Sequence, residues 1–138
     1  MAISDYSSDG YVWVVNGRRI THWGETDPPV TDRQLSSRAT LRQGQGRRAL
    51  KLGHPNPGRE VVMNLSPGSP DSAFMQALSN SNATIEVQGT QIGTLEVKSG
   101  VEGVIIDNGQ SGRGGATTVS DDTYTIHFNI WTDLRGGD

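Results

Sequence analysis

The sequence predicts a mainly β, antiparallel fold with one short α-helix and a long hairpin arm. Only 33% of its 138 residues are hydrophobic and 18 are glycine, so we expect a thin, sheet-like core. Apolar and polar residues alternate in several segments, as is typical of half-buried strands. A single segment changes to helical spacing, which excludes a helical bundle. The length fits one domain over residues 1–138.

The first element is a β-hairpin over residues 11–23. Two strand-like runs there flank Asn16-Gly17, and Asn-Gly favours the positive φ angles of the turn whose twist matches a hairpin. The pair Pro28-Pro29 is expected to break regular structure between Gly24 and Thr31, because proline lacks the backbone donor that a strand needs.

Charge is segregated along the chain. Residues 33–59 carry a net charge of +7 and contain no Asp or Glu, which leaves −10 for the rest. Apolar alternation on both sides of Gly44-Gln45-Gly46 predicts a long hairpin arm with these residues at its tip. Two interpretations stay open: a solvated, flexible loop, or a cationic arm that docks on another copy or on an anionic partner. The cations are Arg33, Arg38, Arg42, Arg47, Arg48, Lys51 and Arg59.

The middle of the chain predicts a strand followed by a helix. Val61, Met63 and Leu65 alternate with less apolar residues and give the strand one apolar face. The helix is expected over residues 69–80, where Ser69 is the N-cap, proline comes first and an acid lies near the positive end of the helix dipole. Its apolar stripe, Phe74 and Leu78, is assigned to the core.

The C-terminal half predicts further strands. Residues 84–88 and 94–98 form a hairpin whose polar face carries Glu86 and Glu96, and residues 101–107 form a short strand. Residues 107–123 have the composition of a long flexible loop. The last strand follows, and its alternating apolar residues are assigned to the core: Tyr124, Ile126, Phe128 and Ile130.

Motifs for catalysis or cofactor binding are weak. The net charge of −3 argues against a dedicated nucleic-acid binder, and the lack of cysteine excludes disulfides and thiolate metal sites. His22, His54 and His127 show no metal-ligand spacing, and glycines 109–115 match no phosphate-binding motif. Glu86 with Glu96, and Asp121-Asp122, are more readily explained as solvated strand or loop carboxylates than as catalytic pairs. We therefore expect no enzymatic activity, no metal and no cofactor.

Apolar runs are too short to span a membrane, and the first residues lack the pattern of a signal peptide. Open sheet edges and segregated charges instead suit head-to-tail contacts between identical copies. The residues thus point to self-assembly.

The order of elements resembles that of the tail tube proteins of contractile-tailed bacteriophages. The resemblance rests on the N-terminal hairpin, the long arm, the strand that enters the Ser-Pro turn and short helix of residues 65–78, and the final strand 124–131. It extends over most of the chain. Residues 107–123 match no feature of that family.

The resemblance implies a β-sandwich or barrel-like subunit with one helix, assembled into stacked hexameric rings that form the tail tube. Such a protein would belong to the virion, be assembled in the host bacterial cytoplasm, and contact the tail sheath protein and the baseplate or terminator proteins. DNA would pass through the tube without specific binding. By this resemblance, Arg38, Arg42, Arg47, Arg48, Lys51 and Arg59 would form the inter-ring arm, while Glu86 and Glu96 would face an anionic lumen that repels phosphates.

Other interpretations remain open. A tube initiator, terminator or other baseplate-proximal component would share the fold and differ in whether it polymerises. A monomeric carbohydrate-binding β-sandwich would use Trp13, Trp23 and Trp131 as an aromatic platform, although Trp13 lies among apolar residues that favour burial. A hydrolase that uses carboxylates is disfavoured.

Overall fold

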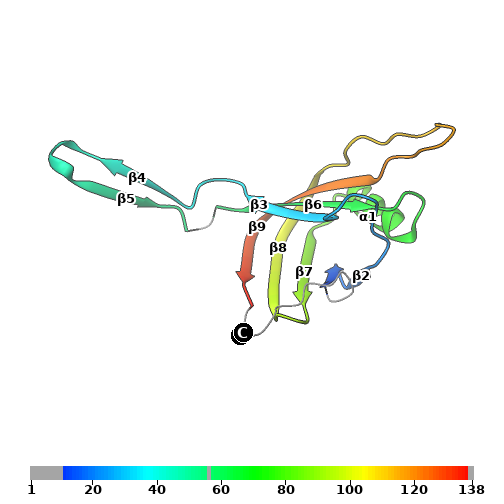
Figure 1. The fold of residues 1–138 in the computed structure, drawn as a ribbon, viewed down its shortest axis with the longest axis horizontal. Helices are drawn as coiled ribbons and strands as arrows, with labels where there is room; N and C mark the ends of the chain where they lie inside the picture. Colours follow the sequence, from blue (N-terminus) through cyan, green and yellow to red (C-terminus); the bar gives the residue numbers. More distant parts are fainter. Residues whose placement is uncertain (1–10, 56, 137–138) are drawn as a thin grey trace.

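The computed structural model describes residues 11–55 and 57–136, and it confirms a mainly β fold with one short helix. A seven-stranded antiparallel sheet curls into a half-barrel in the order β2-β1-β7-β8-β9-β6-β3, and β4-β5 form a separate two-stranded sheet. Figure 1 shows the arm extending from the body. The elements are β1 (Tyr11–Val15), β2 (Arg18–Ile20), β3 (Val30–Gln34), β4 (Ala39–Gln43), β5 (Ala49–Gly53), β6 (Arg59–Leu65), α1 (Pro70–Asn80), β7 (Ile85–Gln91), β8 (Glu96–Asp107) and β9 (Asp122–Leu134).

The hairpin predicted over residues 11–23 is present as β1 and β2. Asn16 and Gly17 both take positive φ, 47° and 84°, as the tight turn requires. The Asn16 side chain also accepts a hydrogen bond from the backbone N–H of Glu86 at 2.7 Å. The turn residue therefore ties β1 to the start of β7 as well as closing its own hairpin.

The helix α1 begins and ends as its capping signals predict. Ser69 accepts a hydrogen bond from the Ser72 backbone N–H at 3.2 Å, and the helix spans Pro70–Asn80. Met75 is the fully buried apolar residue of α1, whereas Phe74 and Leu78 pack at the margin of the core. The helix is therefore rotated so that Met75, which directly follows the predicted core residue Phe74, points inward.

Strand β3 is a difference from the sequence prediction. Its first residues fall in the segment that the prolines were expected to break, yet Val30–Gln34 pairs antiparallel with β6, Val30 opposite Met63. The break ends at Pro29, whose carbonyl accepts a hydrogen bond from the Asn64 N–H. Because β3 is the last strand of the sheet, it closes one side of the half-barrel and presents an edge.

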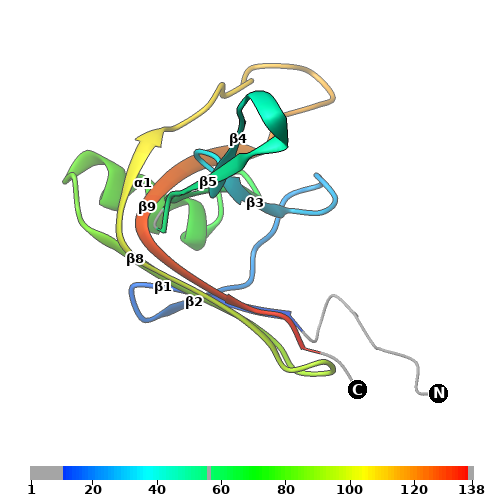
Figure 2. The ribbon, with the colours of Figure 1, turned by 90° about the vertical axis from the view of Figure 1, so that its left-hand side faces the viewer.

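The long strands β8 and β9 bend together and produce the curl that Figure 2 shows. On β8, Glu102 takes a φ of 56° between the inward-facing Gly100 and Gly103. On β9, Phe128 is buried and Trp131 is half-buried, with the ring centroids 5.6 Å apart, while the two residues between them are exposed. Ile130 is therefore 44% exposed, in contrast to its predicted place in the core, because the alternation changes phase at this bend.

Gly103 lets the ring of Phe128 pack directly on the backbone of β8. A Cβ at this position would overlap that ring and lie 3.0 Å from the carbonyl oxygen of Ile85. We expect Gly103→Ala to lower the free energy of unfolding by about 1–3 kcal/mol through overpacking, measured by urea denaturation. Gly53→Ala is the matched control, because a Cβ there meets no atom within 4 Å. Equal unfolding free energies for the two variants would contradict this packing role.

The concave face of the half-barrel is divided into two ends. The end near α1 is apolar and includes Met63, Leu65, Met75, Ile126 and Phe128, all nearly or fully buried. The other end is polar and includes Asp32, Arg59, Gln91, Glu96 and Lys98. The fold thus combines a conventional hydrophobic core with a buried polar interior at its opposite end.

Candidate assembly surface

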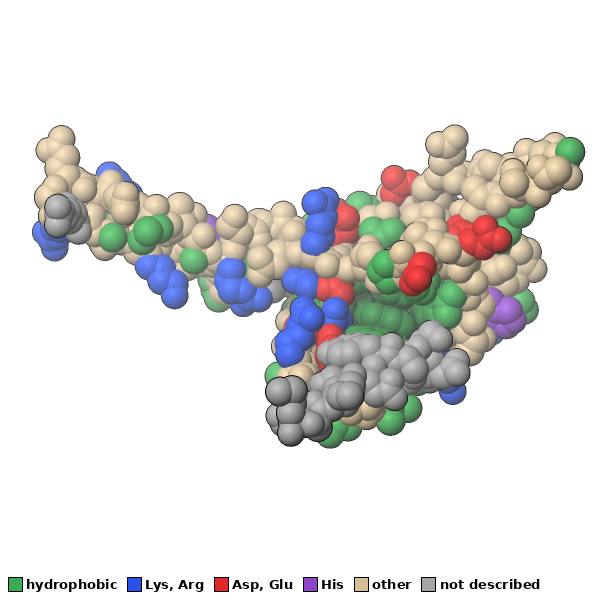
Figure 3. All heavy atoms as spheres, viewed as in Figure 1, with side chains coloured by type: hydrophobic (Ala, Val, Ile, Leu, Met, Phe, Trp, Pro, Cys, Tyr) green, Lys and Arg blue, Asp and Glu red, His purple; other side chains and the backbone are tan. Residues whose placement is uncertain are grey.

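The β4–β5 hairpin is the most exposed regular structure in the described chain. All ten residues of the two strands are exposed, and the ribbon extends away from the body in Figures 1 and 3. Leu41 and Leu50 are 65% and 59% exposed. A two-stranded ribbon without packing on one face is marginally stable in water, and exposed leucines on such a ribbon are typical of interaction surfaces.

Cations accompany these leucines on the arm, which we define as residues 38–54. Leu50 lies directly across from Arg42, and Leu41 lies across from Lys51, so each face combines an apolar and a cationic side chain. Figure 3 shows no acidic side chain on the visible side of the arm. Within residues 11–55 and 57–136, neither Arg42, Arg48 nor Lys51 has an ion-pair partner. A surface that offers both anionic and apolar groups would suit this arm.

The remaining arm cations of the sequence prediction behave differently. Arg38 lies just before β4, and its guanidinium donates to the Gln34 side chain at 3.1 Å. The side chain of Arg47 lies outside the described part of the chain. Arg59 begins β6 and is not part of the hairpin: its guanidinium, 14% exposed, pairs with Asp32 inside the half-barrel. The arm is thus shorter than the predicted range 33–59, and Arg59 belongs to the interior.

Glu86 and Glu96, the predicted lumen-facing pair, lie on opposite faces of the sheet. Glu86 is exposed beside the buried Ile85 and Val87. Glu96 lies opposite Gln91 on the concave side, and its side chain is 6% exposed, 3.8 Å from the Lys98 ammonium. The positive φ of Leu95, 60°, and the longer β7 change the predicted register, so the two carboxylates do not line one wall.

A buried ion-pair network crosses the polar end of the half-barrel. Asp32 on β3 accepts from the Lys98 ammonium at 2.6 Å and from the guanidinium of Arg59, although two strands separate β3 from β8 in the sheet. Burial opposes ionisation of Asp32, but the hydrogen bonds from Lys98 and Arg59 outweigh it, so the pKa of Asp32 is lowered. The network ties the two walls of the half-barrel together.

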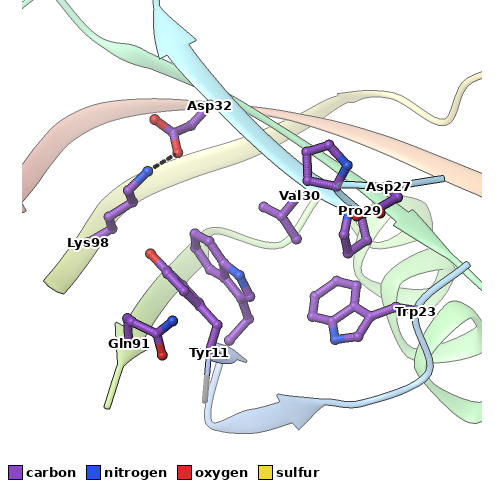
Figure 4. A pocket seen from close by; sticks show the side chains of 10 residues that line it. Tyr11, Trp23, Asp27, Pro29, Val30, Asp32, Gln91 and Lys98 are labelled. Carbon is purple, nitrogen blue, oxygen red and sulfur yellow. Dashed lines mark hydrogen bonds and ion pairs between the residues drawn. The ribbon is translucent and has the colours of Figure 1, made fainter. Parts of the chain in front are cut away.

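An open cavity of about 330 Å³ lies next to this network, between β1 and the segment that leads into β3 (Figure 4). Trp13, Trp23 and Pro29 contribute its apolar wall, and Tyr11 and Gln91 contribute polar groups. Tryptophan 131 is not part of this lining; it packs on Phe128 and beneath the Arg59 guanidinium, 5.8 Å from the ring centroid. The three tryptophans therefore do not form one exposed platform, and Trp13 is only 7% exposed.

The histidines lie in separate places. His22 contacts the Asp71 carboxylate at 3.0 Å, His127 contacts Glu60 at 3.1 Å, and His54 is exposed at the base of the arm. In the described ranges no three His, Asp or Glu side chains are grouped so as to hold a metal ion. No helix in the same ranges is long and apolar enough to cross a membrane.

The segment predicted as a loop over residues 107–123 is a loop from 108 to 121. It projects from the body in Figure 1 and is exposed apart from Asp121 at its end. Arg113 anchors it by pairing with Asp122 at the start of β9. The Asp121 carboxylate accepts backbone hydrogen bonds from Glu25 and Thr26 at 3.1 and 2.9 Å. The consecutive carboxylates thus have structural contacts with two different loops.

Comparisons with solved structures find a similar fold in two chains of the anti-feeding prophage. The chain superposes on a chain of the cryo-EM structure of the anti-feeding prophage cap, the AFP tube terminating cap, with a TM-score of 0.57 and 11% identity over 99% of this chain and 95% of that one. A chain of the six-fold symmetrised anti-feeding prophage baseplate gives a TM-score of 0.58 and 12% identity over 97% of each chain. This chain shares its fold with both. No protein-family model and no curated protein sequence matches it.

Proposed function

We propose that the protein is a structural subunit of a phage-like tail, located at the tube-terminating or baseplate-proximal end, and that its arm binds a neighbouring copy. The observation that carries the proposal is the arm itself: a fully exposed hairpin with leucines and cations on both faces. The fold shared with chains of a tube terminating cap and a baseplate supports this place in the particle. The function is passive and mechanical, with no catalytic step.

Cohesion in such an assembly comes from repetition. An exposed ion pair contributes only about 0.2–1 kcal/mol, so a single arm arginine holds a neighbour weakly. A closed ring repeats each contact in every subunit, and burial of the arm leucines adds an apolar contribution at each one. A six-membered ring would match the symmetry applied to the baseplate.

A second candidate is the tube subunit itself, which the order of elements along the chain favours. It would stack hexameric rings inside a sheath and conduct DNA without specific binding. Of the two carboxylates predicted to face the lumen, Glu86 is the exposed one and would contribute to an anionic wall. The length of the assembled particle distinguishes the two candidates. A tube subunit polymerises indefinitely, whereas a terminal component stops at one or a few rings.

Electron microscopy and sedimentation of the full-length chain test the proposal. We expect rings or short stacks of limited length, and we expect Arg42→Glu to raise the dissociation constant by at least about tenfold because it reverses a charge in every interface. Its urea unfolding should stay within about 0.5 kcal/mol of the wild type, since the side chain is exposed.

The matched control is Arg19→Glu on β2, an exposed strand arginine outside the arm with no ion-pair partner in the described residues. It should assemble like the wild type. Tubes of indefinite length would favour the second candidate. A wild-type chain that stays a 14.8 kDa monomer at high concentration would contradict both.

A further inference from the structure

The cavity beside β3 contains buried polar groups that have no hydrogen-bond partner within residues 11–55 and 57–136. Gln91 is 1% exposed, and neither its amide oxygen nor its amide nitrogen makes a hydrogen bond to the described part of the chain. The buried hydroxyl of Tyr11, across the strand pair from Gln91, is also unpartnered. Both side chains line the cavity, as Figure 4 shows. Because buried amides are normally hydrogen-bonded, this pair indicates that a polar group from outside completes the site.

The rest of the cavity suits a polypeptide with apolar side chains. Trp23, Pro29 and Val30 form an apolar wall, and the volume of about 330 Å³ lies at the lower end of the range for ligand pockets. The strand β3 borders the cavity and ends the sheet, so it offers an edge with unpaired backbone groups. A small apolar molecule would leave both the amide and this edge unsatisfied.

The charged side chains at the cavity that have no ion-pair partner in the described ranges are acidic. Asp27 lines it and Glu25 lies two residues before, and both are exposed with no ion-pair partner in the described ranges. The basic side chain in the cavity, Lys98, is already paired with Asp32. The arm carries the complementary set, unpaired cations beside leucines, and projects away from its own body in Figure 3. An arm that fills the cavity would therefore come from another copy.

We propose that this cavity receives the β4–β5 arm of a second copy. Leucine 50 or Leu52 packs against Trp23 and Pro29, and the arm cations meet Glu25 and Asp27. Polar groups of the arm satisfy the Gln91 amide and the Tyr11 hydroxyl. The proposal rests on the proposed function, since it names the surface that the arm binds.

Disulfide cross-linking tests this pairing directly, because the natural chain has no cysteine. Two full-length variants, Leu50→Cys in the arm and Asp27→Cys at the cavity, are mixed and oxidised, so that a heterodimer can only form between copies. The control mixes Leu50→Cys with Arg19→Cys. We expect at least about tenfold more cross-linked product from the cavity pair than from the control, as a specific contact requires. Equal yields in particles that assemble normally would overturn the proposal.

Replacing the amide gives a second, independent readout. Gln91→Met keeps the side-chain length and removes the unpaired polar atoms, so we expect the isolated subunit to melt at a higher temperature. The same change should weaken self-association about tenfold, because the arm loses its hydrogen-bond partner. Raised stability with unchanged association would overturn the proposal. If the wild type forms no assembly at all, both the proposed function and the cavity proposal fail. If it assembles without forming the cross-link, only the cavity proposal is overturned.

Discussion

Asp32→Ala is expected to lower the free energy of unfolding by about 3–5 kcal/mol at neutral pH. The Asp32 carboxylate is 6% exposed and pairs with both Lys98 and Arg59, whose side chains are 12% and 14% exposed. Its removal takes away the carboxylate that the two buried cations share and leaves each with a longer ion pair of 3.8 Å, Lys98 with Glu96 and Arg59 with Asp133. It also breaks the link between β3 and β8, strands that are not neighbours in the sheet.

Urea denaturation followed by tryptophan fluorescence measures this effect. The matched control is Glu86→Ala, which removes an exposed carboxylate with no ion pair in the described part of the chain and should cost less than about 0.5 kcal/mol. A loss below about 1 kcal/mol for Asp32→Ala would mean that the network does not hold the half-barrel together.

Asp71→Ala is expected to cost about 2–4 kcal/mol, because one buried carboxylate joins α1 to the first hairpin. It accepts from the backbone N–H groups of Thr21 and His22 at 2.8 and 3.0 Å and from the Arg18 guanidinium at 2.9 Å. Burial opposes ionisation of Asp71, but these hydrogen bonds outweigh it and hold its pKa far below the ordinary value.

The pH dependence of unfolding gives the characteristic signature of Asp71. Its pKa is lower in the folded than in the unfolded chain, so its contribution is complete above about pH 4, the unfolded value, and is lost as the pH falls further. Wild-type stability should therefore decline below about pH 4, and the decline should be shallower in Asp71→Ala. If the free energy of unfolding declines equally steeply with falling pH in the wild type and in Asp71→Ala, this role is contradicted.

Local signals in the sequence were sufficient for several elements. The Asn-Gly turn and the Ser69 cap each depend on residues a few positions apart, and both occur where the sequence predicts them. The short hairpin of the arm follows from alternation on both sides of Gly44 and Gly46. The sequence therefore predicted most strands and the helix of this fold.

Features that depend on distant contacts were not predictable in this way. Ile130 is exposed because β8 and β9 change phase together, which no residue on β9 alone indicates. Glu96 is on the concave side because its pairing with Gln91 sets the register. Arg59 looks like an arm cation in the sequence, but its partner Asp32 precedes it by 27 residues. Each error arises from a partner outside the local pattern.

The candidate assembly surface also has one part that local sequence predicts, the arm, and one part that depends on distant contacts, the cavity. Counting charge along the chain reveals the arm, because its cations and the absence of acids are contiguous in the sequence. The cavity combines side chains from β1, the β3 lead-in and β7, so Tyr11, Pro29 and Gln91 share no sequence pattern. The sequence offered Trp13, Trp23 and Trp131 as an aromatic platform, with Trp13 expected to be buried, and of these Trp13 and Trp23 line the cavity.

Hydrogen exchange of the arm amides, compared between the free subunit and the assembled particle, tests the central claim most directly. In the free subunit the β4–β5 amides should exchange rapidly, because an uncovered two-stranded ribbon is marginally stable. In the particle the same amides should become protected by at least about tenfold, while the amides of β6 and β9 stay slow in both states. Arm amides that exchange equally fast before and after assembly would contradict the claim that this hairpin binds a neighbouring copy.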